Sequence, residues 1–149
     1  MATTISHTVE IDRTPIAVWA VLADTARYPD WNPFITRLSG ELEVGARLKV
    51  VIEPPGRRPM TFRPTVLDQR PGEVLHWRGR LLLPGLFDGE HRFELEALPS
   101  GRTRFTQSET FSGLLVPALR SMLAPTRLGF EHMNTALKEY AEARPAARS

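Results

Sequence analysis

A histidine and a glutamate on two alternating polar and apolar stretches are the side chains of this sequence best suited to acid–base chemistry. His91 falls in residues 88–98, and Glu109 falls in residues 102–112. An imidazole that hydrogen-bonds to a carboxylate can transfer a proton near neutral pH, as a general acid or base does. Whether the two side chains meet depends on how the two stretches pair.

The pairing of these stretches follows from their side-chain pattern. Residues 99–101 (Pro-Ser-Gly) predict the turn of a β-hairpin, for which two registers one residue apart are conceivable. Only one register keeps the largely apolar sets of both strands on the same face, with Leu95 opposite Phe105 and Phe93 opposite Gln107. The pattern therefore selects that register.

This register places His91 opposite Glu109 on the inner face of the sheet, where opposed Cβ atoms lie about 4.5–5.5 Å apart. A buried carboxylate without a partner costs several kcal/mol, so we expect the pair to hydrogen-bond, with Gln107 as a neutral polar contact nearby. Three roles remain open for the pair. It satisfies its own polar groups at the mouth of a cavity, it orients a ligand, or it catalyses an aldol-type cyclisation or a dehydration.

The elements that must position this pair begin with a strand and a short helix. Residues 3–12 alternate as a strand, and Thr14 as N-cap with Pro15 at the first helical position starts a helix that ends near Asp24. A second short helical turn fits within residues 25–34. Six further stretches with period two predict an antiparallel meander: 35–41, 46–53, 60–69, 73–82, 88–98 and 102–112.

The C-terminal part predicts a long amphipathic helix. Pro117 and Pro125 separate a short helical piece from a main helix over about 126–143, which carries Phe130, Met133 and Leu137 on its apolar face. Residues 144–149 are expected to form a frayed tail. The expected architecture is α+β, with a curved antiparallel sheet of about seven strands wrapped around the long helix and two short helices after the first strand.

Five stretches, together with this order of elements, are similar to one known superfamily. They are residues 18–24 (Val-Trp-Ala-Val-Leu-Ala-Asp), 28–34 (Tyr-Pro-Asp-Trp-Asn-Pro-Phe), 90–93 (Glu-His-Arg-Phe), 111–115 (Phe-Ser-Gly-Leu-Leu) and 129–138 (Gly-Phe-Glu-His-Met-Asn-Thr-Ala-Leu-Lys). The chain resembles the START-like (SRPBCC) superfamily in its polyketide cyclase/dehydrase and lipid-transport branch. The resemblance implies a helix-grip fold with a cavity for a hydrophobic small molecule. It implies no single reaction, because such folds serve as carriers, receptors and enzymes.

The alternation along the strands and the apolar face of the long helix predict which residues line that cavity. His91 and Glu109 are the candidate catalytic pair. The expected ligand-binding residues are Trp77, Phe93, Phe105, Gln107, Phe111, Phe130, Met133 and Leu137.

Length and composition narrow the class of protein. The 149 residues fit one domain spanning 1–149, and the absence of cysteine excludes disulfides and thiolate metal sites. Basic and acidic residues, 19 and 17, are interspersed with a net charge of +2, which is typical of a solvated surface and not of a nucleic-acid interface. No apolar run reaches the roughly 20 residues of a membrane span, and the first residues lack a secretion signal, so we expect a cytoplasmic protein.

The histidines show no metal-ligand spacing, and no phosphate loop or dinucleotide motif is present; we therefore expect no metal and no cofactor. The leading hypothesis is binding or transport of a hydrophobic small molecule such as a lipid, isoprenoid or aromatic polyketide. One alternative is a polyketide cyclase or dehydratase that uses His91 and Glu109. Another is a protein-interaction module. The sequence determines neither the ligand nor the oligomeric state.

Overall fold

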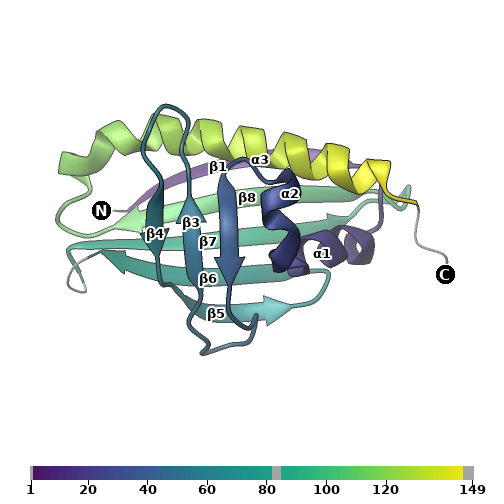
Figure 1. The fold of residues 1–149 in the computed structure, drawn as a ribbon, viewed down its shortest axis with the longest axis horizontal. Helices are drawn as coiled ribbons and strands as arrows, with labels where there is room; N and C mark the ends of the chain where they lie inside the picture. The colour runs from purple at the N-terminus through teal and green to yellow at the C-terminus, as the bar shows by residue number, and fades with distance from the viewer. Residues whose placement is uncertain (1, 82–84, 146–149) are drawn as a thin grey trace.

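The structure, a computed structural model, describes residues 2–81 and 85–145, apart from the side chain of Leu81. The elements are β1 (Thr3–Ile11), α1 (Pro15–Ala23), the 3₁₀ turn η1 (Thr25–Arg27), α2 (Tyr28–Trp31), β2 (Ile35–Ser39), β3 (Lys49–Ile52), β4 (Met60–Phe62), β5 (Thr65–Arg70), β6 (Val74–Leu81), β7 (Phe87–Ala97), β8 (Thr103–Ser112), the 3₁₀ helix η2 (Pro117–Met122) and α3 (Leu123–Ala143). They form the predicted helix-grip α+β fold, with the long α3 lying along an antiparallel sheet (Figure 1).

The strands form two antiparallel sheets instead of one continuous meander. The larger sheet has the order β1-β8-β7-β6-β5, and the smaller has the order β2-β3-β4. A bridge between Arg47 and Thr65 connects them. Figure 1 shows the smaller sheet running across the larger one, with α3 along the β1 side.

The prediction of a single strand over residues 60–69 was wrong. β4 ends at Phe62 and β5 begins at Thr65, because Pro64 between them has no N–H to donate to a strand ladder. The Pro64 carbonyl instead accepts a hydrogen bond from the Leu48 N–H at 2.8 Å. The chain passes from the smaller to the larger sheet here, and the described residues contain eight strands in all.

The predicted register of the last hairpin is confirmed. Phe93 pairs with Gln107, and His91 pairs with Glu109, in a ladder that runs without interruption from Asp88–Ser112 to Ala97–Thr103. Alternation is strict here: Phe93 is fully buried, while its neighbour Glu94 is exposed. A shift of one residue would have reversed both faces.

The first helix begins as predicted, whereas the last one begins earlier. The Thr14 hydroxyl accepts from the Ala17 N–H at 3.3 Å, and Pro15 opens α1. The last helix starts at Leu123 and contains Pro125 in its first turn. Proline is tolerated there because the first four N–H groups of a helix have no partner within the helix.

Fully buried side chains fix α3 against β1 and β8. Phe130, Met133 and Leu137 of α3 have no exposed surface, as predicted for its apolar face. Of the predicted tail, residues 146–149 lie outside the described part, while the Arg144 carbonyl accepts a hydrogen bond from Arg13 at 2.9 Å. None of the helices that the structure describes is long and apolar enough to cross a membrane.

Candidate functional site

The predicted His91/Glu109 pair is formed. His91 Nδ1 lies 3.0 Å from Glu109 Oε1, and the histidine is only 3% exposed. The imidazole stacks on the Trp77 ring, with centroids 4.9 Å apart and an interplanar angle of 13°. The rings of Phe93 and Phe130 meet it edge-on at 4.7 and 5.4 Å. Three aromatic contacts and one hydrogen bond therefore fix the plane and direction of the imidazole.

The hydrogen bond also fixes the tautomer of His91. A carboxylate can only accept when it is ionised; with Glu109 in that form, Nδ1–H donates to Oε1, and Nε2 carries the lone pair whenever the ring is neutral. Nε2 is buried and has no hydrogen-bond partner among the described residues. Buried polar atoms are nearly always paired, so this nitrogen is available to a ligand group or to water.

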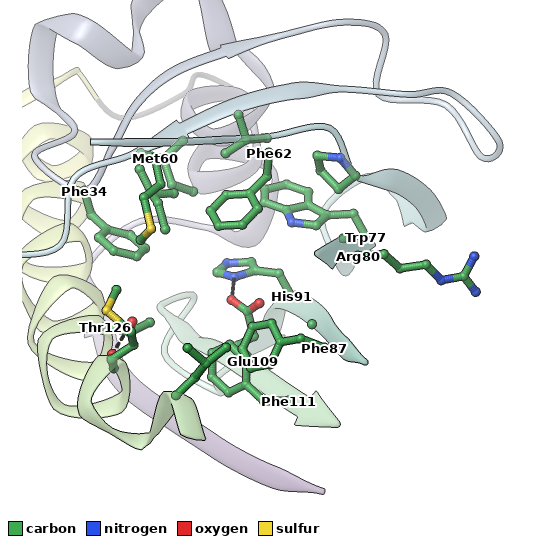
Figure 2. A pocket seen from close by; sticks show the side chains of 18 of the residues that line it. Phe34, Met60, Phe62, Trp77, Arg80, Phe87, His91, Glu109, Phe111 and Thr126 are labelled. Carbon is green, nitrogen blue, oxygen red and sulfur yellow. Dashed lines mark hydrogen bonds and ion pairs between the residues drawn. The ribbon is translucent and has the colours of Figure 1, made fainter. Parts of the chain in front are cut away.

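A cavity of about 280 Å³ adjoins this pair. Figure 2 shows His91 and Glu109 in the middle of its lining side chains, which come from both sheets, from η2 and from the N-terminal part of α3. The lining is mostly apolar: Phe34, Ile35, Val50, Ile52, Met60, Phe62, Pro64, Trp77, Gly79, Arg80, Phe87, Gly89, His91, Glu109, Phe111, Leu119, Met122, Leu123 and Thr126. The charged end of Arg80 turns away from the pair and lies 3.7 Å from Asp88.

Two facing glycines leave room for this cavity. Gly79 of β6 and Gly89 of β7 are register partners, and parity places both on the inner face beside Trp77 and His91. An inner position without a side chain leaves a gap, which neighbouring side chains could fill only by moving toward it. Close packing of the rest of the core prevents that movement. The bare part of the sheet thus coincides with the cavity.

Only part of the predicted lining set faces this cavity. Trp77, Phe111, His91 and Glu109 line it. Six others have no exposed surface and pack in the core instead: Phe93, Phe105, Gln107, Phe130, Met133 and Leu137. Their large side chains fill the space between the larger sheet and the middle of α3, which leaves the cavity at the N-terminal end of that helix. These six therefore do not line this cavity, and a role for them in ligand binding stays a prediction.

Gln107 has a different partner from the expected ligand. Its Nε2 donates to Asn134 Oδ1 of α3 at 2.8 Å, and Asn134 Nδ2 donates to the His7 carbonyl of β1 at 2.9 Å. Asn134 Nδ2 also lies 3.0 Å from His7 Nδ1. This polar chain joins α3 to β8 and β1.

The wall formed by the smaller sheet was missed by the sequence reasoning. Phe34, Val50 and Phe62 belong to or precede its strands and line the cavity. Their period-two pattern was visible, but one continuous meander would have placed them elsewhere. The break at Pro64 was the available signal, since proline is confined to edges and interruptions of sheets.

No group of three or more His, Cys, Asp or Glu side chains that could hold a metal ion occurs within the part of the chain that the structure describes. The cavity combines the His91/Glu109 pair with mostly apolar walls. It can take up an apolar body, contact one polar group of it, and exchange a proton with that group.

The sequence matches the family model described as polyketide cyclase / dehydrase and lipid transport over residues 2–142. No curated protein sequence matches the chain significantly.

Solved structures with the same fold include proteins of different roles. An aromatase/cyclase called Zhui, from Streptomyces sp. R1128, superposes with a TM-score of 0.78 at 19% identity over 97% of this chain and 96% of its own. A START superfamily protein from Mycobacterium smegmatis gives 0.70 at 21% identity over 94% and 97%. Norcoclaurine synthase from Thalictrum flavum, in complex with dopamine and hydroxybenzaldehyde, gives 0.74 at 12% identity over 99% and 90%. At these identities the likeness shows a shared fold.

Proposed function

We propose that this chain, which belongs to the polyketide cyclase/dehydrase and lipid transport family, binds a hydrophobic small molecule in the cavity between its two sheets and α3. The observation that carries the proposal is a mostly apolar cavity of about 280 Å³ with one hydrogen-bonded His/Glu pair in its wall. Ligand sites have this composition: apolar walls supply affinity, and a few polar groups fix orientation.

The size of the cavity favours a compact ligand. Its volume lies just below the roughly 300–1,000 Å³ that is usual for small-molecule pockets. Aromatic rings of Phe34, Phe62, Trp77 and Phe111 provide flat walls. A molecule with one or two fused rings, or a short branched chain, suits this space better than a lipid with two acyl chains.

Binding can be tested without knowing the natural ligand. Native mass spectrometry of the purified protein, followed by solvent extraction, reveals any apolar molecule that it retains. Naphthalene serves as a fluorescent probe of the cavity. Gly79→Val should weaken its binding by about tenfold or more, or 1.4 kcal/mol, because the new side chain enters the cavity.

The matched control is Thr61→Val on β4. Thr61 is exposed and lies between the lining residues Met60 and Phe62, so the substitution alters the same wall from outside. It should leave naphthalene binding unchanged. Equal binding to the wild type and to Gly79→Val would show that the probe sits elsewhere, and would contradict the proposal.

A second candidate function is acid–base catalysis, favoured by the fixed tautomer of His91 and its unpartnered Nε2. Neutral His91 would accept a proton at Nε2 from a carbon next to a ligand carbonyl, while Glu109 stabilises the imidazolium. Returning that proton to a hydroxyl leaving group would complete a dehydration, and returning it to an alkoxide would complete an aldol-type cyclisation.

This second function has a direct assay. Exchange of the α-protons of 2-tetralone in D₂O can be followed by NMR, because enolisation is the first half of either reaction. The wild type should accelerate exchange, and His91→Gln should lower that acceleration by about 10²-fold, the typical contribution of a general base. Binding of naphthalene by His91→Gln checks that the cavity is intact. Full exchange by this variant would refute the catalytic role.

A further inference from the structure

We propose that Gly89 is a positioning residue of this site, and that it selects ligands carrying a hydroxyl group. The bare backbone of Gly89 seats the Glu109 carboxylate so that Oε1 accepts from His91 while Oε2 is left for a hydrogen-bond donor of the ligand. The inference rests on the proposed binding function and defines the polar group of the ligand.

The carboxylate occupies the space that a side chain at position 89 would take. A Cβ built on Gly89 would overlap Glu109 Oε2 and lie 3.5 Å from Glu109 Cδ. In the ladder, Gly89 pairs with Phe111, and Glu109 pairs with His91. The Glu109 side chain therefore leans diagonally across β7, from its own partner toward the glycine.

Backbone conformation does not account for this glycine. Gly89 has no positive φ, and the ladders on both sides of it run without a bulge from Phe87 onward in β7. Glycine within a regular strand is unfavourable and often marks a close approach by another group. The group that approaches Gly89 is the Glu109 carboxylate.

The facing glycine provides an internal comparison. Gly79 is the register partner of Gly89 and also lines the cavity, yet a Cβ at Gly79 would meet only Pro64 Cβ, at the ordinary distance of 3.9 Å. The two glycines share strand geometry and cavity, and they differ in contact with Glu109. An alanine at position 79 fills part of the cavity, whereas one at position 89 also displaces the carboxylate.

The chemistry of Oε2 defines the ligand group. Oε1 is held by His91 Nδ1 at 3.0 Å, and the Glu109 side chain is 21% exposed against 4% for His91. The open part of the pair is therefore the carboxylate, which can only accept hydrogen bonds when ionised. An alcohol, enol or phenol on an apolar body satisfies it, whereas a ligand without a donor does not.

The contact between Gly89 and Glu109 is tested by a double-mutant cycle with Gly89→Ala and Glu109→Ala, measured by urea unfolding. Gly89→Ala should destabilise the protein when Glu109 is present and have little effect when Glu109→Ala has removed the carboxylate. An equal effect in both backgrounds would overturn the proposal, because the glycine would then serve only the strand. If Gly89→Ala fails to fold, folding of the double variant supports the proposal, and failure of both overturns it.

The position of the Glu109 carboxylate relative to His91 can be tested independently by NMR of the His91 imidazole in ¹⁵N-labelled protein. The Nδ1–H proton bonded to Glu109 should give a downfield signal in the wild type and in the control Gly79→Ala, and this signal should disappear in Gly89→Ala. Persistence of the signal in a folded Gly89→Ala protein would show that the methyl group leaves the pair in place, and would overturn the proposal.

Ligand selection is tested with 2-naphthol and naphthalene, which differ by one hydroxyl. The wild type should bind 2-naphthol about tenfold more tightly, a difference of 1.4 kcal/mol. The ratio of the two affinities should fall to about one in Gly89→Ala and Glu109→Ala and stay at about ten in Gly79→Ala, whatever each change does to naphthalene binding itself. Equal affinities in the wild type would overturn the assignment of Oε2. If naphthalene binds none of these proteins, that result would contradict the proposed binding function. The urea and NMR results would still decide the role of Gly89.

Discussion

Replacing Asn134 by alanine should destabilise the protein by about 2–4 kcal/mol, because this buried amide joins α3 to the sheet through polar groups that would lose their partners. Asn134 and Gln107 have no exposed surface. Without Asn134, Gln107 Nε2 loses its acceptor at 2.8 Å and the His7 carbonyl loses its donor at 2.9 Å. Since Gln107 Oε1 already has no partner among the described residues, the whole Gln107 amide would be left unpaired.

The magnitude follows from the cost of burying unpaired groups. Each unsatisfied buried polar group costs about 1–3 kcal/mol, and the partly exposed His7 recovers some of its loss through water. Urea unfolding at constant pH measures the change as a lower midpoint with an unaltered slope. Naphthalene binding to the folded variant tests whether the cavity depends on this contact, because α3 also carries the lining residue Thr126.

The matched variant replaces both partners by apolar residues. Gln107→Leu with Asn134→Leu leaves neither side-chain amide in the core, so it should lie within about 1 kcal/mol of the wild type and be more stable than Asn134→Ala. A change below about 0.5 kcal/mol for Asn134→Ala would refute this account of the polar chain. So would a double variant that is as unstable as the single one.

Three further predictions concern stability. Burial raises the pKa of Tyr28 above its usual value, so stability should be full below about pH 10 and fall as the pH rises above it; Tyr28→Phe should abolish this alkaline loss in pH-dependent urea unfolding. The hydrogen bond from Lys138 holds the pKa of the Glu142 carboxyl below its usual value of 4.5. The stabilisation that this carboxylate gives to the folded protein is therefore present above pH 4.5 and is lost as the pH falls below it. Glu142→Gln should remove this acid dependence of the free energy of unfolding. Gly129→Ala should destabilise the protein by up to about 2 kcal/mol in urea unfolding. The new methyl group would overlap the Phe34 ring, which costs about 1–3 kcal/mol, whereas alanine gains only about 1 kcal/mol in helix propensity.

Each of these has its own control. If Tyr28→Phe still loses stability at alkaline pH, other groups cause that loss. If the acid dependence of stability is unchanged in Glu142→Gln, groups other than Glu142 cause the loss at low pH. For Gly129, the background Phe34→Leu provides space. If Gly129→Ala lowers stability as much in the Phe34→Leu background as in the wild type, contact with Phe34 is not the reason for a glycine at this position.

The local parts of the fold could be predicted because each depends on neighbouring residues. Thr14 and Pro15 start α1 by capping and fixed φ, which sequence alone reveals. The register between His91 and Glu109 was predictable because alternation is strong on both strands and a shift of one residue would bury charges. These features need no knowledge of distant parts of the chain.

Features that depend on long-range packing were not predictable in this way. Residues 60–69 alternate through Pro64, so their pattern alone does not show that the two halves belong to different sheets. Gln107 and Asn134 meet because α3 lies at a particular height on the larger sheet, which strand parity does not determine. Parity correctly turned Gln107 inward, but it could not distinguish a ligand from another side chain as its partner.

The position of the cavity depends on which inner residues are small, and this explains why the apolar residues expected to line it fill the core instead. Phe93 and Phe105 stack at 5.6 Å and occupy the space under the middle of α3. Further along β7, and opposite on its neighbour β6, the inner face carries Gly89 and Gly79. Trp77 and the smaller sheet form walls around the gap that these glycines leave. Large apolar side chains mark the filled part of a core, whereas facing glycines on regular strands mark the part left open to a ligand. One of these glycines, Gly89, also gives room to the Glu109 carboxylate, so the space for a ligand and the position of the group that orients it are linked at this residue.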